Sequence, residues 1–125
     1  MKSIRIRDIT KYKRWDFEQL KFVEIFRNIF VNFSIDFYDV GVKTPMMYKN
    51  RPAGSRKIII PLEGKLKVIT EKQSVIFDPD REGLSLVIIG QKEKRQFENV
   101  GTIPAKVLAI YAPPFHIREI DHIVK

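Results

Sequence analysis

The chain has 125 residues, of which 44% are hydrophobic, 30% are charged and 11% are aromatic, and its formal net charge is +8. This composition indicates one globular domain with a sizeable core and excludes a disordered chain. The absence of cysteine excludes disulfides, thiolate metal sites and a cysteine nucleophile. No apolar run approaches the roughly 20 residues of a membrane-spanning helix, and the N-terminal stretch lacks the apolar core of a signal peptide, so we expect a cytoplasmic protein.

The N-terminal segment, residues 14–30, has a pattern that fits two structures. Its apolar residues have the spacing of a short helix: Phe17, Leu20, Phe22 and Val23. The same segment also suits a loop that leads into strands, and periodicity does not separate the two. In residues 31–38, by contrast, apolar and polar residues alternate, which predicts a strand with two different faces.

Short β-rich runs fill most of the remaining chain. Residues 57–69 predict a strand, a turn at Glu63-Gly64 and a second strand. Three further runs, SVIF, GLSLVII and AKVLAIYA, are separated by Asp-Pro-Asp and Val-Gly-Thr turns. Many short strands with little helix predict a sandwich or a small barrel.

This order of strands and turns resembles the cupins, which are jelly-roll barrels (double-stranded β-helices) that carry two short motifs. IIIPLEG, ending at Gly64, resembles the end of the first motif, and GLSLVIIGQKEKRQFENVG followed by PAKVLAIYAPP resembles the second motif and its next strand. The resemblance covers most of the chain from about Phe30 onward. It implies an all-β cupin-type barrel with little helix in a single domain, 1–125, with an arm (1–28), a barrel (29–115) and a tail (116–125). It also implies a homodimer.

A second, looser resemblance is to the nucleotide-sugar ketoisomerases among the cupins. IDFYDVG, PLEGKLKVI, FDPDREGLSL and the tail REIDHI follow the order of elements in that family. There, loop histidines act as acid and base on a keto-sugar, whereas the corresponding stretch here, PMMYKNRPAG, contains no histidine. A metal-independent sugar isomerase or epimerase would therefore need another proton carrier, and Tyr48, Lys49 and Lys57 are the candidates if burial shifts their pKa values.

The metal ligands of cupins are also missing from this chain. Metal-binding cupins use two histidines and a carboxylate from the first motif and one histidine from the second. The resemblance aligns Lys57 with the carboxylate and Arg95 with the last histidine, while Arg51 and Ala53 fall at the first two. None of these residues ligates a divalent cation as imidazole or carboxylate does, and His116 and His122 lie in the tail. We therefore expect no metal and no other cofactor.

Basic residues are concentrated around the aligned positions. Between Asp39 and Glu63 there are no acidic residues, but there are five basic ones: Lys43, Lys49, Arg51, Arg56 and Lys57. If Lys57 and Arg95 point into the barrel, the former metal pocket becomes an anion pocket, because arginine and lysine suit carboxylates and phosphates. The alternative is that these residues are solvated surface cations, and both interpretations remain open.

Three functions are compatible with the sequence. The first is a metal-free cupin that binds a small anionic or sugar ligand, such as a nucleotide-sugar, at Arg51, Lys57 and Arg95. The second is a basic nucleic-acid-binding module that uses cations and aromatic residues near the N-terminus, for which we expect only weak, non-specific association: Lys11, Tyr12, Lys13, Arg14 and Trp15. The third is a structural or regulatory dimer without catalysis, whose barrel is filled with side chains.

Overall fold

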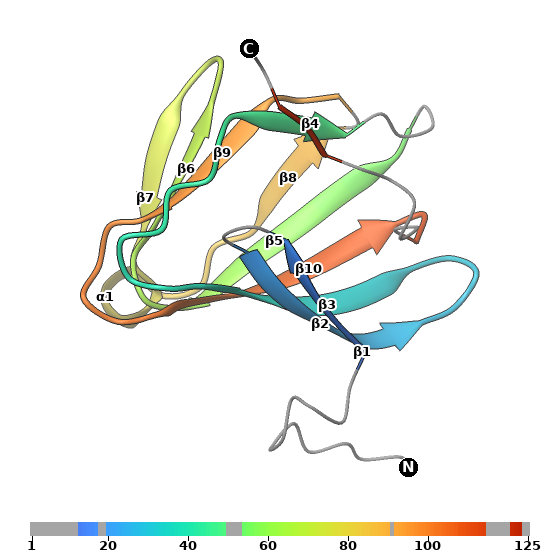
Figure 1. Cartoon of the computed structure of the whole chain (residues 1–125), viewed down its shortest axis with the longest axis horizontal. Helices are drawn as coiled ribbons and strands as arrows, with labels where there is room; N and C mark the ends of the chain where they lie inside the picture. Colours follow the sequence, from blue (N-terminus) through green and yellow to red (C-terminus); the bar gives the residue numbers. More distant parts are fainter. Residues whose placement is uncertain (1–12, 18–19, 50–53, 91, 115–120, 124–125) are drawn as a thin grey trace.

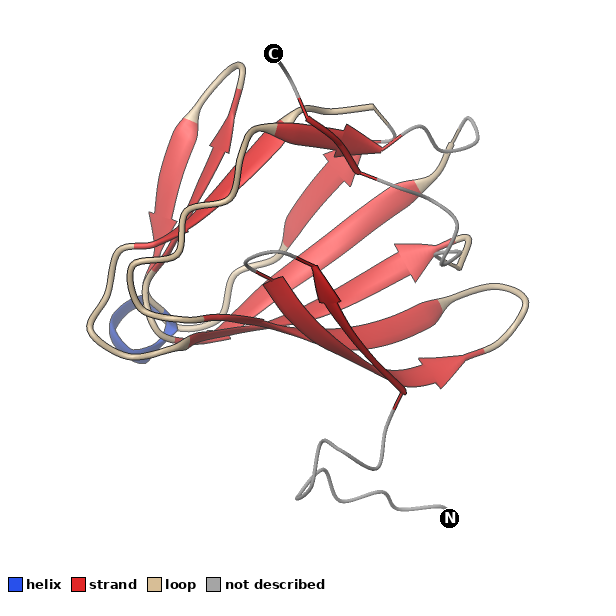
Figure 2. Cartoon of the chain, in the orientation of Figure 1, coloured by secondary structure: helices blue, strands red, loops and turns tan. Residues whose placement is uncertain are grey.

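The structure is a computed structural model that describes the backbone of residues 13–17, 20–49, 54–90, 92–114 and 121–123. Side chains are described for residues 23–48, 54–90 and 92–114. Strands dominate these residues, and the short helix α1 (Pro79–Glu82) lies on one side of the molecule (Figure 2). The prediction of an all-β fold with little helix is therefore confirmed. No helix in the described part of the chain is long and apolar enough to span a membrane.

Two antiparallel sheets make up the fold. The six-stranded sheet has the order β1 (Lys13–Phe17), β2 (Leu20–Arg27), β3 (Asn32–Tyr38), β10 (Ala105–Ala112), β5 (Arg56–Glu63) and β8 (Val87–Gly90). The five-stranded sheet has the order β11 (Asp121–Ile123), β4 (Met47–Lys49), β9 (Arg95–Asn99), β6 (Leu66–Thr70) and β7 (Ser74–Phe77). In Figure 1, connections between the sheets gather at the left of the view, near α1.

The N-terminal segment forms strands rather than a helix. β1 and β2 pair along their length, with Lys13 opposite Glu24 and Phe17 opposite Leu20, and β2 continues the pairing onto β3. The helical interpretation of this segment is therefore wrong. Its apolar spacing was too short to exclude a strand hairpin, and pairing with β3 supplies the backbone partners that a hairpin alone lacks. At the other end of the chain, β11 pairs with β4.

The alternation in β3 has a definite orientation. The polar residues Asn32, Ser34 and Asp36 are buried together with Tyr38, and the apolar residues between them are only half-buried. Directly opposite residues in an antiparallel pair share a face, so the partners of β3 on β10 show which face points inward. Asp36 lies opposite Val107, and Val107 is fully buried. The polar face of β3 therefore faces the barrel interior.

The apolar core lies between the sheets. It is a cluster of buried residues from both sheets: Tyr38, Ile59, Leu66, Val68, Ile89, Phe97, Ala105, Val107, Ala109 and Tyr111. The rings of Tyr38 and Phe97, one from each sheet, lie 5.6 Å apart between centroids. Asn99 closes the neighbouring turn, because its amide donates to the carbonyl oxygens of Tyr38 and Ile103 and its oxygen accepts from Gly101 N–H. Asn99 therefore closes the Val-Gly-Thr turn that the sequence predicts.

The predicted turn at Glu63-Gly64 carries the chain from one sheet to the other. β5 ends at Glu63 in the six-stranded sheet, and β6 begins at Leu66 in the five-stranded sheet. Gly64 has a φ of +80°, and a Cβ there would lie 2.9 Å from the Cα of Ala105. Both the conformation and the close approach require glycine at this position.

Candidate functional site

Lys57 and Arg95, the two cations aligned with cupin ligand positions, both point into the barrel. Along β5 the buried positions alternate, so that Lys57, Ile59 and Pro61 share the inner face. Along β9 the same alternation buries Arg95, Phe97 and Asn99. Lys57 has 7% of its surface exposed and Arg95 4%, so neither is a solvated surface cation. The two sheets therefore each contribute one buried cation to the interior.

Lys57 has contacts with both sheets. Its Nζ atom lies 3.8 Å from a carboxylate oxygen of Asp36, which is also buried. The same atom lies 5.3 Å from the ring centroid of Phe97 and 5.2 Å from that of Tyr111, within the range of cation–π attraction. The ammonium group is thus held between one carboxylate and two aromatic rings.

The electrostatics of this cluster favour a protonated lysine and a neutral tyrosine. Burial by itself lowers the pKa of Lys57, but Tyr111 and Asp36 together outweigh it and raise that pKa above its ordinary value, although Arg95 acts against them. Burial raises the pKa of Tyr111, and Asp36 raises it further, while Lys57 and Arg95 lower it, with a net increase. At neutral pH Lys57 is therefore a cation and hydrogen-bond donor, and it has no free electron pair with which to act as a base.

Polar residues that the sequence analysis did not select complete the cluster. Asn32 lies opposite Tyr111, which in turn lies opposite Lys57, so these three residues form one row on the inner face of the six-stranded sheet. The hydroxyl of Ser34 donates to Asp36 over 3.3 Å. We call the set the inner polar cluster: Asn32, Ser34, Asp36, Lys57, Arg95 and Tyr111. The sequence signal for the β3 members of this cluster was the set of polar residues in the alternating pattern of that strand. Such polar residues would be assigned to the solvent-facing side unless the strand lies in a barrel.

Ser55 lies close to this cluster in sequence. It precedes Lys57 by two residues and is 2% exposed. Its Oγ atom makes no hydrogen bond with the residues that the structure describes. A buried hydroxyl without a partner loses its hydration and gains nothing in return, so Ser55 has unused hydrogen-bonding capacity.

The remaining candidates are not brought into the cluster. Met47 lies opposite Arg95, so the next residue along β4, the half-buried Tyr48, points to the opposite face of the five-stranded sheet. Tyr48 and Lys57 therefore do not share a site. Arg51, Ala53 and His116 lie outside the described residues, and so do the side chains of Lys49 and His122. The same holds for the side chains proposed to contact nucleic acid: Lys11, Tyr12, Lys13, Arg14 and Trp15.

No metal site is formed by the described residues. Among them there is no group of three or more histidine, cysteine, aspartate or glutamate side chains that could hold an ion. Lys57 and Arg95 occupy the positions that the cupin resemblance gives to a carboxylate and a histidine, and both are cationic side chains that repel a divalent metal. The donor set described here suits an anion better than a cation.

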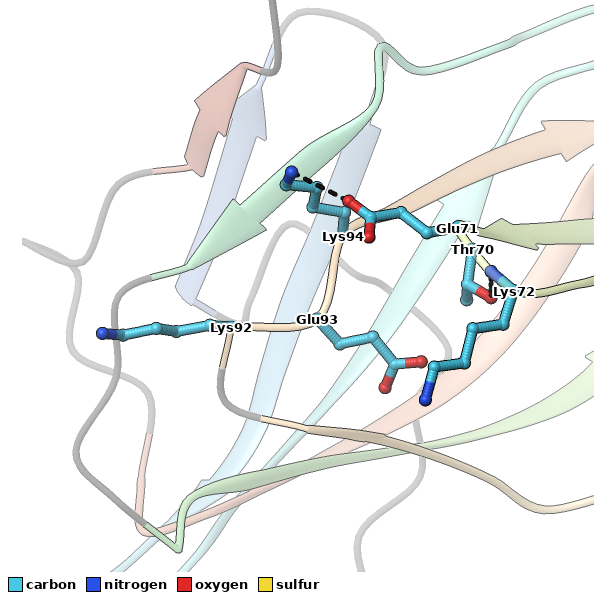
Figure 3. Close-up of a pocket in the computed structure, with 6 residues that line it drawn as sticks. All are labelled: Thr70, Glu71, Lys72, Lys92, Glu93 and Lys94. Atoms are coloured by element: carbon cyan, nitrogen blue, oxygen red, sulfur yellow. Dashed lines mark hydrogen bonds and ion pairs between the residues drawn. The ribbon is translucent and has the colours of Figure 1, made fainter.

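A depression with a volume of about 420 Å³ lies on the surface of the barrel. One of its lining residues, Thr70, pairs with Arg95 in the five-stranded sheet, so the depression and Arg95 lie at the same end of the barrel. Figure 3 shows its six lining residues: Thr70, Glu71, Lys72, Lys92, Glu93 and Lys94. Lys94 is paired with Glu71 over 2.8 Å, and Glu93 accepts a hydrogen bond from Gly90 N–H. Lys92 points away from the other side chains (Figure 3). These mixed surface charges form a polar rim rather than a second buried site.

No protein-family model matches the sequence, and a comparison with curated proteins gives no match. Solved structures do resemble the fold. The cupin-2 domain Rru_A2000 from Rhodospirillum rubrum has a TM-score of 0.73 at 10% identity, over 99% of this chain and 80% of that one. The polyketide cyclase RemF from Streptomyces resistomycificus has a TM-score of 0.72 at 10% identity, over 98% and 87% of the two chains. The Cnp3 cupin domain from Schizosaccharomyces pombe has a TM-score of 0.67 at 15% identity, over 85% of this chain and 72% of that one. The chain therefore has the cupin fold.

Proposed function

We propose that the protein binds a small anionic or sugar ligand, without a metal, at the inner polar cluster. The observation that carries this proposal is the burial of Lys57 and Arg95 on the inner faces of two opposed sheets. Burying a cation is unfavourable unless a charge or a polar group compensates for its lost hydration. A barrel that served only as a scaffold would be stabilised as well or better by apolar residues at these positions.

The charges in the cluster favour an anion. Among the buried side chains that the structure describes, Lys57 and Arg95 are the cations, and Asp36 is the carboxylate. An anionic group on the ligand would neutralise the second of these two positive charges. The planar guanidinium of Arg95 matches the geometry of a carboxylate or a phosphate. The hydroxyl and amide groups of the inner polar cluster, from Asn32, Ser34 and Tyr111, suit the hydroxyls of a sugar.

The cluster supports binding better than catalysis. The raised pKa of Lys57 keeps its amine protonated, so this candidate proton carrier does not act as a base near neutral pH. Tyr111, with its raised pKa, is neutral and can donate a hydrogen bond. We therefore propose ligand binding with little or no turnover of a keto-sugar, and we give the isomerase or epimerase reaction the lower rank.

A thermal-shift screen of carboxylates, sugar phosphates and nucleotide-sugars tests the proposal. Arg95→Gln removes the buried charge. Arg56→Gln is a matched control, because Arg56 lies on the same sheet beside Lys57 but is exposed on its outer face. A charge-assisted hydrogen bond contributes about 1.5–3 kcal/mol, so a ligand that stabilises the wild type should bind Arg95→Gln about one to two decades more weakly. Arg56→Gln should bind like the wild type.

Two results would contradict the proposal. One is equal stabilisation of the wild type and Arg95→Gln by the same ligands, and the other is the absence of any stabilising ligand across the three chemical classes. Arg95→Lys separates charge from geometry, because lysine keeps the charge but lacks the planar fork. If Arg95 binds a carboxylate or phosphate through two parallel hydrogen bonds, Arg95→Lys should recover only part of the affinity.

We also propose that the working form is a homodimer, as the likeness to the cupins implied. Neither the inner polar cluster nor the rim in Figure 3 specifies a dimer surface.

A further inference from the structure

Ser55 carries a buried hydroxyl on the inner face of the barrel. Ser55 is buried, Arg56 is exposed and Lys57 is buried again, so the alternation of β5 continues back through Ser55 and gives it the inward orientation of Lys57. Ser55 is 2% exposed, and its Oγ atom makes no hydrogen bond with the residues that the structure describes. Buried polar groups are nearly always hydrogen-bonded, so Ser55 has capacity that the described residues leave unused.

Ser55 and Arg95 lie at the same end of the barrel. β5 ends at the Gly64 turn, and β6 leads away from that turn and pairs antiparallel with β9, so β5 and β9 run in the same general direction. Both strands run toward the side of the molecule where α1 lies (Figure 1). Ser55 immediately precedes β5 and Arg95 begins β9, so both lie at the end far from the Gly64 turn, beside the polar rim.

The two residues also lie at a similar depth in the barrel. Lys57 and Phe97 mark one level, because the Nζ atom of Lys57 lies 5.3 Å from the ring centroid of Phe97. Ser55 precedes Lys57 by two residues and Arg95 precedes Phe97 by two, which places each about 7 Å nearer the polar rim. Facing sheets lie about 10 Å apart, and a long arginine side chain spans much of that distance. An anion at the guanidinium of Arg95 would therefore come close to Ser55.

The charges of the site match a ligand with a single negative charge. Among the buried side chains that the structure describes, the cations Lys57 and Arg95 and the carboxylate of Asp36 leave one positive charge in excess. The polar rim adds little, because Glu71 and Glu93 offset two of its three lysines. A carboxylate carries one negative charge at neutral pH, whereas a phosphate monoester carries about −1.5 to −2. The charge balance therefore favours a carboxylate over a phosphate.

We propose that Ser55 and Arg95 together hold the carboxylate of a small hydroxylated carboxylic acid, a proposal that rests on the anion binding proposed above. The hydroxyl of Ser55 donates to one carboxylate oxygen, and the guanidinium of Arg95 donates to the carboxylate from the opposite sheet. Asn32 and Tyr111 lie in the row of Lys57, about 7 Å deeper than Ser55, and they bind the hydroxyls of the ligand. The carboxylate thus points toward the rim, and the hydroxylated carbon chain points inward.

Isothermal titration calorimetry with D-gluconate tests the role of Ser55. Ser55→Ala removes the hydroxyl, and Ser74→Ala is the matched control, because Ser74 is an exposed serine on the edge strand β7. Ser74→Ala should bind D-gluconate as the wild type does. Ser55→Ala should bind it about tenfold more weakly, since a hydrogen bond to a charged group is lost. Equal affinities of Ser55→Ala and the wild type would overturn the proposal.

Thermal unfolding without a ligand distinguishes a binding serine from a structural one. A buried hydroxyl without a partner in the protein gains nothing for its lost hydration, so Ser55→Ala should melt at the same temperature as the wild type or at a higher one. A lower melting temperature for Ser55→Ala than for Ser74→Ala would show that the hydroxyl has a partner within the protein, and the binding role of Ser55 would be wrong.

A panel of related compounds tests the ligand class and separates it from the anion binding on which it rests. D-gluconate and D-glucuronate should raise the melting temperature of the wild type, whereas D-glucose, which lacks the charge, and hexanoate, which lacks the hydroxyls, should raise it less. Stronger stabilisation by a glucose phosphate or by UDP-glucose, lost in Arg95→Gln, would overturn the carboxylate assignment and leave the anion binding intact. The absence of stabilisation by every compound would overturn both.

Discussion

The two faces of strand β3 have opposite chemistry, in an order that is unusual for a barrel strand. Asn32, Ser34 and Asp36 point inward and are buried, whereas Phe33, Ile35 and Phe37 point outward and are half-buried. A buried polar group is more informative than an exposed apolar one, because its loss of hydration must be compensated. The inner face is therefore the face on which we expect a ligand.

Contacts within the protein partly compensate for the hydration that the polar residues of the inner face lose. Asp36 accepts a hydrogen bond from Ser34 and faces Lys57 at 3.8 Å. The apolar core beside this cluster, with Val107, Leu66 and Phe97 buried between the sheets, supplies the burial of apolar surface that stabilises the fold. One barrel interior thus combines a packing region and a charged region.

The largest expected effect comes from breaking the ion pair on the inner face. Lys57→Met leaves the carboxylate of Asp36 without its nearest cation, and Asp36→Asn leaves Lys57 without its carboxylate. Removing one partner of a buried pair typically costs about 3–5 kcal/mol of the free energy of unfolding, and replacing both together costs far less. We expect the double variant to recover most of what either single variant loses in urea unfolding. Additive losses would show that Lys57 and Asp36 do not act as a pair.

A smaller effect is expected at the turn that brings the two inner faces together. Gly64→Ala combines a positive φ with a Cβ 2.9 Å from the backbone of Ala105. Gly54→Ala is the matched control, because Gly54 has a φ of +82° but no atom within 4 Å of the added Cβ. The strained backbone should cost each variant about 1 kcal/mol, and the contact with Ala105 should bring the loss in Gly64→Ala to about 2–3 kcal/mol. Equal melting temperatures for the two variants would contradict a close approach at Gly64.

Sequence reasoning found the strands and the turns because both depend on local patterns. Gly64 and the Val-Gly-Thr sequence around Gly101 carried clear turn signals, and both lie in turns in the structure. The segment around Phe22 was ambiguous, because its few apolar residues fit either a helix or a hairpin, and only pairing with β3 decides between them.

The candidate site could be predicted in part. Lys57 and Arg95 were selected by alignment with cupin ligand positions, and both are buried on inner faces. Asp36, the partner of Lys57, was missed because the two residues are 21 positions apart in sequence and meet only through the sheet. The alternating pattern of β3 predicted two different faces, but it did not predict which face points toward the barrel interior. That depends on the strands with which β3 pairs. Small apolar residues on the inner face of β10, such as Ala109 opposite Ser34, are such neighbours.

The smallest expected effect is a loss of stability at alkaline pH that originates in the inner face alone. The pKa values of Lys57 and Tyr111 are both raised in the folded protein, Lys57 by Tyr111 and Asp36 against the effect of burial, and Tyr111 mainly by burial. The unfolded chain therefore releases these protons at a lower pH than the folded chain does. The contribution of these two groups to the free energy of unfolding is complete below about pH 10, and it is lost as the pH rises through their pKa values in the folded protein.

Tyr111→Phe should flatten the fall in unfolding free energy between about pH 9 and pH 11 in urea titrations, because one of the two groups is gone. Tyr48→Phe, on the opposite face of its sheet, should follow the wild-type curve. If Tyr48→Phe flattens the curve as much as Tyr111→Phe, the alkaline loss of stability does not come from the barrel interior. The electrostatic difference that we assign to the inner and outer faces would then be wrong.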